Sequence, residues 1–308
     1  MSKRAFIFPG QGSQYAGMGK DLAANFRVAK DTFAEADDAL GFKLSALCFN
    51  GPEEDLKLTM NTQPAILAVS IAALRILLTE SDVQADFLAG HSLGEYSALV
   101  AAGALTLPDA LRTVRSRGRF MQEAVPVGVG AMAVILSIEE SLLAEICLEA
   151  SQGEVVSPAN FNSPGQIVIA GHATAVNRAI EIAKARGFRK AMLLPVSAPF
   201  HSALMIPAGE RLAEVLQQVE VAEMKLPVIT NVEATQNQDS ARVRELLVAQ
   251  VSAPVKWDSS VRELVRLGVS SFIEIGPGKV LSGLVKRIDK EVSTANIDDS
   301  AGLKALQS

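Results

Sequence analysis

The strongest constraint on the fold lies between residues 86 and 102, where an apolar run passes through a glycine-rich turn into a helical pattern. Asp86–Ala89 is predicted as a buried strand, and a helix is predicted from Leu93 to about Ala102. The turn reads Gly90-His-Ser-Leu-Gly94, which is a G-x-S-x-G sequence. In a strand-turn-helix setting this sequence holds the serine hydroxyl exposed above a sheet. Strands are also predicted over residues 5–8 and 228–232, and a helix over residues 18–40. Further strands alternate with helices along the chain, which predicts a parallel sheet covered on both faces.

The pattern changes at residues 126–130 (PVGVG), and this change predicts a second unit. Between residues 131 and 196 the order strand, helix, strand, strand, helix, strand is typical of a ferredoxin-like unit. We therefore predict an α/β protein with a parallel-sheet, α/β-hydrolase-like large subdomain formed by residues 1–125 and 198–308. A ferredoxin-like small subdomain, residues 126–197, is inserted in it. The tail after Lys290 shows little pattern, and no element is predicted there.

The composition excludes several classes of protein. Of 308 residues 49% are hydrophobic and 20% charged, so the chain is able to bury a core, and disorder is excluded. A net charge of −5 argues against a dedicated nucleic-acid binder, which needs an extended positive surface. Cys48 and Cys147 occur without a CxxC or a His/Cys cluster, so no disulfide framework or zinc site is predicted. We expect two small, buried or half-buried side chains in a reducing compartment.

The location of the protein is predicted from its apolar segments. The apolar run at the N-terminus ends at Phe8 and is too short for a signal peptide, so we expect a cytoplasmic protein. The most apolar segment, residues 65–78, is interrupted by Ser70 and Arg75 and is shorter than the roughly 20 residues that cross a bilayer. It is predicted as a buried helix, and no membrane association is expected.

Ser92, at the centre of the glycine-rich turn, is the candidate nucleophile. The helix that follows directs its N-terminal amides and its partial positive charge at the same point. The N–H of Leu93 is therefore a natural donor to an oxyanion formed by attack on a carbonyl. The alternative is a glycine-rich turn without chemistry, because five-residue matches also occur by chance.

A serine nucleophile needs a base, and the chain has only three histidines. His91 is adjacent to Ser92, and adjacent side chains at such a turn point in different directions. His172 follows a strand of the predicted small unit and is interpreted as a surface or turn residue. His201 lies between a strand and a helix, where a loop at the carboxyl edge of a sheet would present it to Ser92. His201 is the best candidate for the base.

Six short motifs in register extend this interpretation. Together they resemble the malonyl-CoA:acyl carrier protein transacylases of bacterial fatty acid synthesis, and the resemblance runs from about residue 4 to residue 288. The motifs are residues 8–13 (FPGQGS), 90–95 (GHSLGE), 117–121 (RGRFM), 160–166 (NFNSPGQ), 199–201 (PFH) and 274–278 (EIGPG).

The resemblance implies a role for each catalytic residue. Ser92 takes the malonyl group from coenzyme A, and His201 first deprotonates Ser92 and then protonates the departing thiolate. The main-chain amides of Gln11 and Leu93 form the oxyanion hole. A main-chain carbonyl at the position of Gln250 orients the histidine, in place of an aspartate.

The resemblance also implies how the substrate is selected. Arg117 grips the free carboxylate of malonyl through two parallel hydrogen bonds, so acetyl-CoA is rejected. By spacing alone a solvated helix face would be the favoured explanation of Arg117. Phe200 leaves little room for a methyl group, which predicts malonyl in preference to methylmalonyl. Asn162 and Gln166 correspond to family positions near the entry for coenzyme A or pantetheine.

The implied partners are malonyl-CoA, which is a substrate, and holo acyl carrier protein. No cofactor, metal or nucleic acid is expected, and we expect a monomer. One alternative is a serine esterase or thioesterase, although α/β-hydrolases place the histidine late in the chain, whereas more than 100 residues follow His201. A second alternative is a non-catalytic module that binds acyl carrier proteins. Hydrolysis of malonyl-CoA without a carrier protein would indicate the esterase or thioesterase. Absence of a covalent acyl-enzyme would indicate the non-catalytic module.

Overall fold

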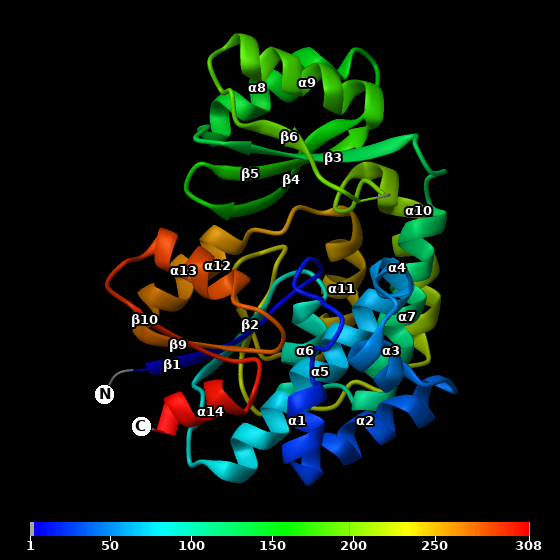
Figure 1. Ribbon diagram of the computed structural model, residues 1–308. Helices are drawn as coiled ribbons and strands as arrows, with labels where there is room; N and C mark the ends of the chain where they lie inside the picture. Colours follow the sequence, from blue (N-terminus) through cyan, green and yellow to red (C-terminus); the bar gives the residue numbers. More distant parts are fainter. Residues whose placement is uncertain (1–2, 197, 308) are drawn as a thin grey trace.

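Two β-sheets organise the chain, with the smaller sheet above the larger one in Figure 1. The computed structural model describes residues 3–196 and 198–307. The predicted end of the small subdomain, Ser197, lies outside the described residues, as do residues 1, 2 and 308.

The large sheet is mixed, with four parallel strand pairs and one antiparallel pair at its edge. Strands β1 and β2 are parallel neighbours, and Phe8 at the end of β1 is in register with Gly90 at the end of β2. The loops that follow the two strands therefore leave the sheet side by side. In spatial order the strands are β10 (Ser293–Ile297), β9 (Val269–Ile275), β1 (Lys3–Phe8), β2 (Phe87–Gly90), β7 (Val228–Ile229) and β8 (Gln236–Asn237).

Helices cover both faces of this sheet (Figure 1). Along β1, Phe6 and Phe8 join one hydrophobic core, and Ala5 and Ile7 join another on the opposite face. A strand buried on both faces reads as a continuous apolar run, which is why this segment was predictable. The first core includes residues of α5 (Thr59–Glu80) and α7 (Leu107–Glu123), and the second includes residues of α12 (Trp257–Arg266) and α13 (Val280–Ile288).

The small sheet is antiparallel, in the order β4-β5-β3-β6. Ala133 and Ile135 of β3 face a core formed with the two helices above the sheet (Figure 1). Met132, on the opposite face of β3, joins the hydrophobic core of the large sheet that contains Phe6 and Phe8. The sheet is therefore packed on both sides. Its elements are β3 (Gly130–Leu136), α8 (Glu140–Ser151), β4 (Val156–Ser163), β5 (Gln166–His172), α9 (Ala173–Ala185) and β6 (Ala191–Leu193).

The remaining helices surround the large sheet. They are α1 (Lys20–Asn25), α2 (Arg27–Leu40), α3 (Leu44–Asn50), α4 (Glu53–Lys57), α6 (Gly94–Ala101), α10 (Ile206–Gln217), α11 (Val243–Ser252), α14 (Ser300–Gln307) and the short 3-10 helices Ala203–Met205 and Ser240–Arg242.

Three predicted elements differ from the structure. The helix predicted over residues 18–40 is interrupted at Phe26, whose extended backbone separates α1 from α2. The strand predicted at 228–232 ends at Ile229, because the chain turns back and pairs with β8. The tail after Lys290, where no element was predicted, forms β10 and α14. As an edge strand β10 is largely half-exposed, so it lacks the apolar pattern of a central strand.

The predicted buried helix is confirmed. By length and composition alone, α5 would be able to span a membrane, but 83% of its most apolar 18-residue stretch is buried inside the protein. Cys48 and Cys147 are both free and buried, as predicted.

Close packing of the serine turn against β1 generates a testable prediction. A Cβ at Gly94 would lie 2.1 Å from the carbonyl oxygen of Phe8, and main chain has little freedom to move away. We expect Gly94→Ala to lower the free energy of unfolding by about 1–3 kcal/mol or more. Gly283, exposed in α13, has no neighbouring atom within 4 Å of the position that a Cβ would take, so Gly283→Ala should instead gain about 0.5–1 kcal/mol. Urea unfolding measures the free energy of unfolding of both variants. Equal losses of stability in Gly94→Ala and Gly283→Ala would contradict the prediction.

Candidate active site

Ser92 occupies the sharp turn between β2 and α6. Its φ of +51° lies in the left-handed region, which costs energy for a residue with a Cβ and marks a constrained position. The side chain of Asn231 fixes this turn from both sides. Its Oδ1 accepts the N–H of Ser92 at 2.6 Å, and its Nδ2 donates to the carbonyl of Gly90 at 2.7 Å. The hydroxyl of Ser92 takes no part in these two contacts and lies at a cavity.

His201 lies beside Ser92, although 109 residues separate the two in the chain. Its Nε2 is 2.7 Å from the Oγ of Ser92, and its Nδ1 is 2.8 Å from the main-chain oxygen of Gln250. A carbonyl oxygen only accepts hydrogen bonds, so Nδ1 carries the proton. In the neutral ring Nε2 is then free to accept the proton of Ser92.

The surroundings keep the ring of His201 neutral. Its side chain is buried, with 4% of the residue exposed. Burial, with a smaller contribution from the positive charge of Arg117, lowers the pKa of His201 to about 3. Near pH 7 His201 is therefore able to act as a base without first losing a proton.

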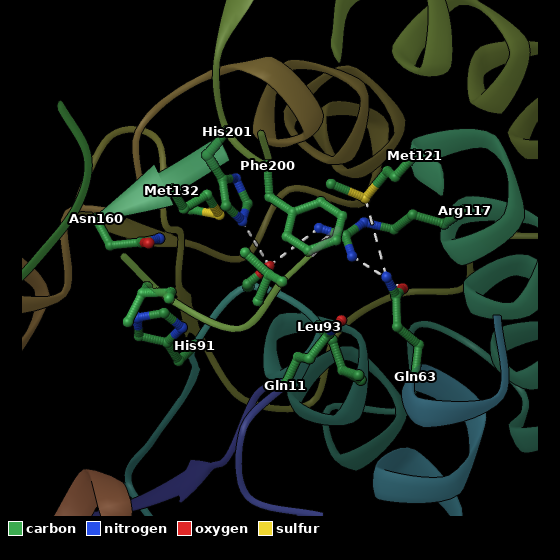
Figure 2. A pocket seen from close by; sticks show the side chains of 13 residues that line it. Gln11, Gln63, His91, Leu93, Arg117, Met121, Met132, Asn160, Phe200 and His201 are labelled. Carbon is green, nitrogen blue, oxygen red and sulfur yellow. Dashed lines mark hydrogen bonds between the residues drawn. The ribbon is translucent and has the colours of Figure 1, made fainter. Parts of the chain in front are cut away.

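Arg117 is 1% exposed and projects from the buried face of α7, which it shares with Val114 and Met121. Its Nη1 donates to Gln63 Oε1 at 2.9 Å (Figure 2), and its Nη2 donates to the Oγ of Ser92 at 3.1 Å. Burial lowers the pKa of this guanidinium.

The partners of Arg117 leave its charge without a direct counter-ion. Its Nη2 also donates to Gln250 Oε1 at 2.9 Å, so all three acceptors are amide or hydroxyl oxygens. No carboxylate within the described ranges lies within 4 Å of the guanidinium, and its Nε has no hydrogen-bond partner there. A buried cation with neutral partners is a favourable place for an anionic group.

The cavity around these groups has a volume of about 120 Å³, which suits a small acyl group. It lies between the large unit and the small sheet, because Met132 and Asn160 on its wall belong to the small sheet (Figure 2). Its wall is formed by Gln11, Gln63, His91, Ser92, Leu93, Arg117, Met121, Met132, Asn160, Leu194, Val196, Phe200 and His201.

Gln11 and Leu93 line this cavity from two neighbouring loops. The loops approach closely, since a Cβ at Gly10 would lie 2.4 Å from the carbonyl oxygen of His91. Within residues 3–196 and 198–307 neither the N–H of Gln11 nor that of Leu93 has a hydrogen-bond partner. Two unpaired main-chain donors in residues that line the same cavity as a serine hydroxyl are able to bind an oxyanion.

The other predicted residues lie at varying distances from the cavity. Phe200 is part of its wall, whereas Asn162 and Gln166 are not. The Oδ1 of Asn162 instead accepts from His91 Nε2 at 2.8 Å, and Gln166 accepts a hydrogen bond from Arg287. Neither contact places these two side chains against an acyl group in the cavity.

The two histidines that were not favoured as the base have other partners. His91 is bound to Asn162, as described above, and not to Ser92. The Nδ1 of His172 accepts the main-chain N–H of Val155 at 2.9 Å, within the small unit. His201 is therefore the histidine that contacts Ser92.

Several residues of the site were not predicted. Asn231 holds the serine turn, and Glu95 is buried beneath it with 2% of its surface exposed. Burial raises the pKa of Glu95 to about 7. Gln63 and Glu95 each carried a signal, because a polar side chain in an otherwise apolar helix is unusual. The side chains of the cavity wall that the sequence did not indicate are Gln63, Met121, Met132, Asn160, Leu194 and Val196.

Comparison with known proteins gives consistent matches over nearly the whole chain. The family model described as "Acyl transferase domain" matches residues 5–304. The malonyl CoA-acyl carrier protein transacylase of Bacillus subtilis is 51% identical, covering 97% of this chain and 94% of that protein. The protein of the same name from Escherichia coli K12 is 47% identical, covering 99% of each chain.

Solved structures agree with these matches. The crystal structure of an acyl carrier protein S-malonyltransferase from Vibrio cholerae superposes with a TM-score of 0.97 at 48% identity, covering 99% of this chain and 100% of that one. A malonyl-transacylase solved in complex with a type II PKS acyl-carrier protein gives 0.96 at 48% identity, covering 99% and 98%. The chain belongs to the acyl transferase domain family, among the malonyl CoA-acyl carrier protein transacylases.

Proposed function

We propose that this protein transfers the malonyl group of malonyl-CoA to the phosphopantetheine thiol of acyl carrier protein through a malonyl-Ser92 intermediate. One observation carries the proposal: the guanidinium of Arg117 lies 3.1 Å from the hydroxyl that contacts His201. A nucleophile beside a buried cation suits an acyl group that carries its own negative charge. The names of the relatives described above support the same substrate and partner.

The first half-reaction acylates the serine. The Oγ of Ser92 attacks the thioester carbonyl while its proton passes to Nε2 of His201, and the N–H groups of Gln11 and Leu93 stabilise the oxyanion. The carbon–sulfur bond then breaks, and His201 returns the proton to the coenzyme A thiolate. Malonyl-Ser92 and free coenzyme A are the products.

The second half-reaction uses the same groups in the same order. The thiol of the carrier protein gives its proton to His201 and attacks the ester carbonyl of malonyl-Ser92. The ester bond breaks, and His201 protonates the oxygen of Ser92. This is a ping-pong transfer in which the main-chain carbonyl of Gln250 keeps the His201 tautomer unchanged. It needs no cofactor, since malonyl-CoA is a substrate.

Two side chains select the acyl group in this proposal. Arg117 turns its guanidinium towards the free carboxylate of malonyl, and Phe200 limits the space beside the α-carbon so that methylmalonyl is disfavoured. Asn162 and Gln166 are proposed to act further out, near the entry for pantetheine, because neither lies on the cavity wall.

The remaining proposals concern architecture and setting. Residues 1–125 and 198–308 are proposed to form an α/β-hydrolase-like subdomain and residues 126–197 a ferredoxin-like one, which the antiparallel order β4-β5-β3-β6 supports. We further propose a monomer in the cytoplasm that supplies fatty acid synthesis. Its partners are malonyl-CoA and holo acyl carrier protein, without nucleic acid or membrane.

The central test is the intact mass of the protein after brief exposure to malonyl-CoA. We expect a malonyl adduct on wild-type protein and none on Ser92→Ala, because the serine oxygen carries the acyl group. Holo acyl carrier protein should then remove the adduct and gain the same mass. Loss of the adduct as free malonate without a carrier would indicate a hydrolase, and absence of any adduct would indicate a non-catalytic module.

Removal of Arg117 should change acyl selection. Arg117→Ala loses the charged hydrogen bonds to the substrate carboxylate, so kcat/KM for malonyl-CoA should fall about 10–100-fold while the low rate with acetyl-CoA stays the same. Arg119→Ala is the matched control, because Arg119 lies two residues away on the exposed face of α7. A similar loss in both variants, or for both thioesters, would contradict the role of Arg117.

The low pKa of His201 predicts how acylation depends on pH. A histidine with an ordinary pKa of about 6.5 loses its neutral form about tenfold between pH 7.5 and pH 5.5. His201, with a pKa of about 3, stays neutral throughout, so the single-turnover rate of Ser92 acylation should not show that loss. The pKa of Glu95 is about 7, so its titration falls within the same pH range. The profile is therefore also measured in Glu95→Gln, which does not titrate at this position. A tenfold fall in both proteins would contradict the prediction.

A further inference from the structure

A carboxylate lies buried one side chain away from the catalytic groups. Glu95 is the second residue of α6, and only 2% of its surface is exposed. Its Oε2 accepts a hydrogen bond from Gln250 Nε2 at 2.8 Å and another from the main-chain N–H of Asn231 at 2.9 Å. None of the hydrogen bonds found for the Glu95 side chain goes to Ser92, His201 or Arg117, so any effect on the reaction passes through an intermediate residue.

Gln250 is that intermediate residue. Its main-chain oxygen accepts from His201, its side-chain Oε1 accepts from Arg117 at 2.9 Å, and its Nε2 donates to the main-chain oxygen of Ser92 at 2.9 Å. The Nε2 group also makes the contact to Glu95 described above. A single carboxamide therefore contacts the nucleophile, the cation and the buried carboxylate.

Only one orientation of this carboxamide satisfies its partners. A carboxamide has one end that accepts and one that donates. Rotation by half a turn would place the NH₂ group of Gln250 against the donors of Arg117, and its oxygen against the carboxylate of Glu95. Both contacts would be repulsive in a buried site where the electrostatic interactions are strong. The ionised carboxylate of Glu95, together with the main-chain carbonyl of Ser92, therefore favours the orientation in which the oxygen of Gln250 faces Arg117.

We propose that Glu95 is a positioning residue for acyl transfer, because it fixes the Gln250 carboxamide and, through it, the guanidinium of Arg117 in the orientation that receives the acyl carboxylate. The inference rests on the proposed function. It assigns to Glu95 an effect on malonyl selection, although Glu95 does not line the cavity. The charge of Glu95 also opposes the effect of burial on the pKa of Arg117, which is consistent with coupling between the two groups.

A purely structural role gives a different expectation. Glu95 also binds Asn231, which holds the turn of Ser92, so Glu95 is able to stabilise the nucleophile without any effect on Arg117. Loss of this stabilisation slows the transfer of every acyl group equally. Coupling through Gln250 slows only an acyl group that carries a carboxylate. The ratio of the malonyl-CoA rate to the acetyl-CoA rate separates the two, and it does not depend on the fraction of folded enzyme.

The experiment is a double-mutant cycle with Glu95→Gln, Arg117→Ala and the two combined, in the full-length protein with holo acyl carrier protein. The introduced carboxamide is close in shape to the carboxylate and still offers an oxygen to Asn231, but it has no charge. We expect kcat/KM for malonyl-CoA to fall about tenfold in Glu95→Gln, since charged hydrogen bonds are roughly twice as strong as neutral ones. The acetyl-CoA rate should stay within about twofold, as should both rates in the control Glu214→Gln, an exposed residue of α10.

The cycle decides between the two roles. Under the proposal, Glu95→Gln no longer lowers kcat/KM for malonyl-CoA when Arg117 is already alanine, since the guanidinium that Glu95 positions is absent. An equal loss for both thioesters, or the same cost in both backgrounds, overturns the proposal while the proposed function stands. Absence of a malonyl adduct on wild-type protein overturns the proposed function and this inference with it.

Discussion

The burial of the Arg117 guanidinium among neutral partners is the condition on which the rest of the site depends. A cation removed from water is costly unless hydrogen bonds or charges compensate, and here amide oxygens and the serine hydroxyl provide the hydrogen bonds. The same charge contributes to the low pKa of His201, so the base is ready at neutral pH. One buried side chain thus influences the protonation state of the proposed base and presents a positive charge to the cavity.

The two sheets deliver the groups that surround this cation. The parallel register of β1 and β2 makes the strands end together, so the loops that carry Gln11 and Ser92 both reach the cavity. The positive φ values of Ser92 and His201 show that both residues are held in backbone conformations that a free chain rarely adopts. The fold therefore has to compensate local strain at the two residues that are proposed to exchange a proton, and the Asn231 contacts are part of that compensation.

The sequence predicted the parts of the site that depend on local pattern. The strand-turn-helix around Ser92 follows from short-range signals, and so does the buried helix α5. Spacing alone favoured a solvated helix face for Arg117, whereas the structure places it on the buried stripe of α7 with Val114 and Met121 and leaves Arg119 exposed. Asn231 and β10 were not predictable in this way. Their positions depend on contacts with residues far away in the chain, which no local pattern encodes.

The cavity wall divides by origin in a way that has a consequence for variation. Met132 and Asn160 come from the small sheet, and Leu194 follows its last strand, whereas the nucleophile and the base come from segments that border the large sheet. The part of the cavity wall formed by Met132, Asn160 and Leu194 is therefore encoded by a different stretch of the sequence from Ser92 and His201. Substitutions at these three positions change the shape of the cavity and leave Ser92, Arg117 and His201 in place.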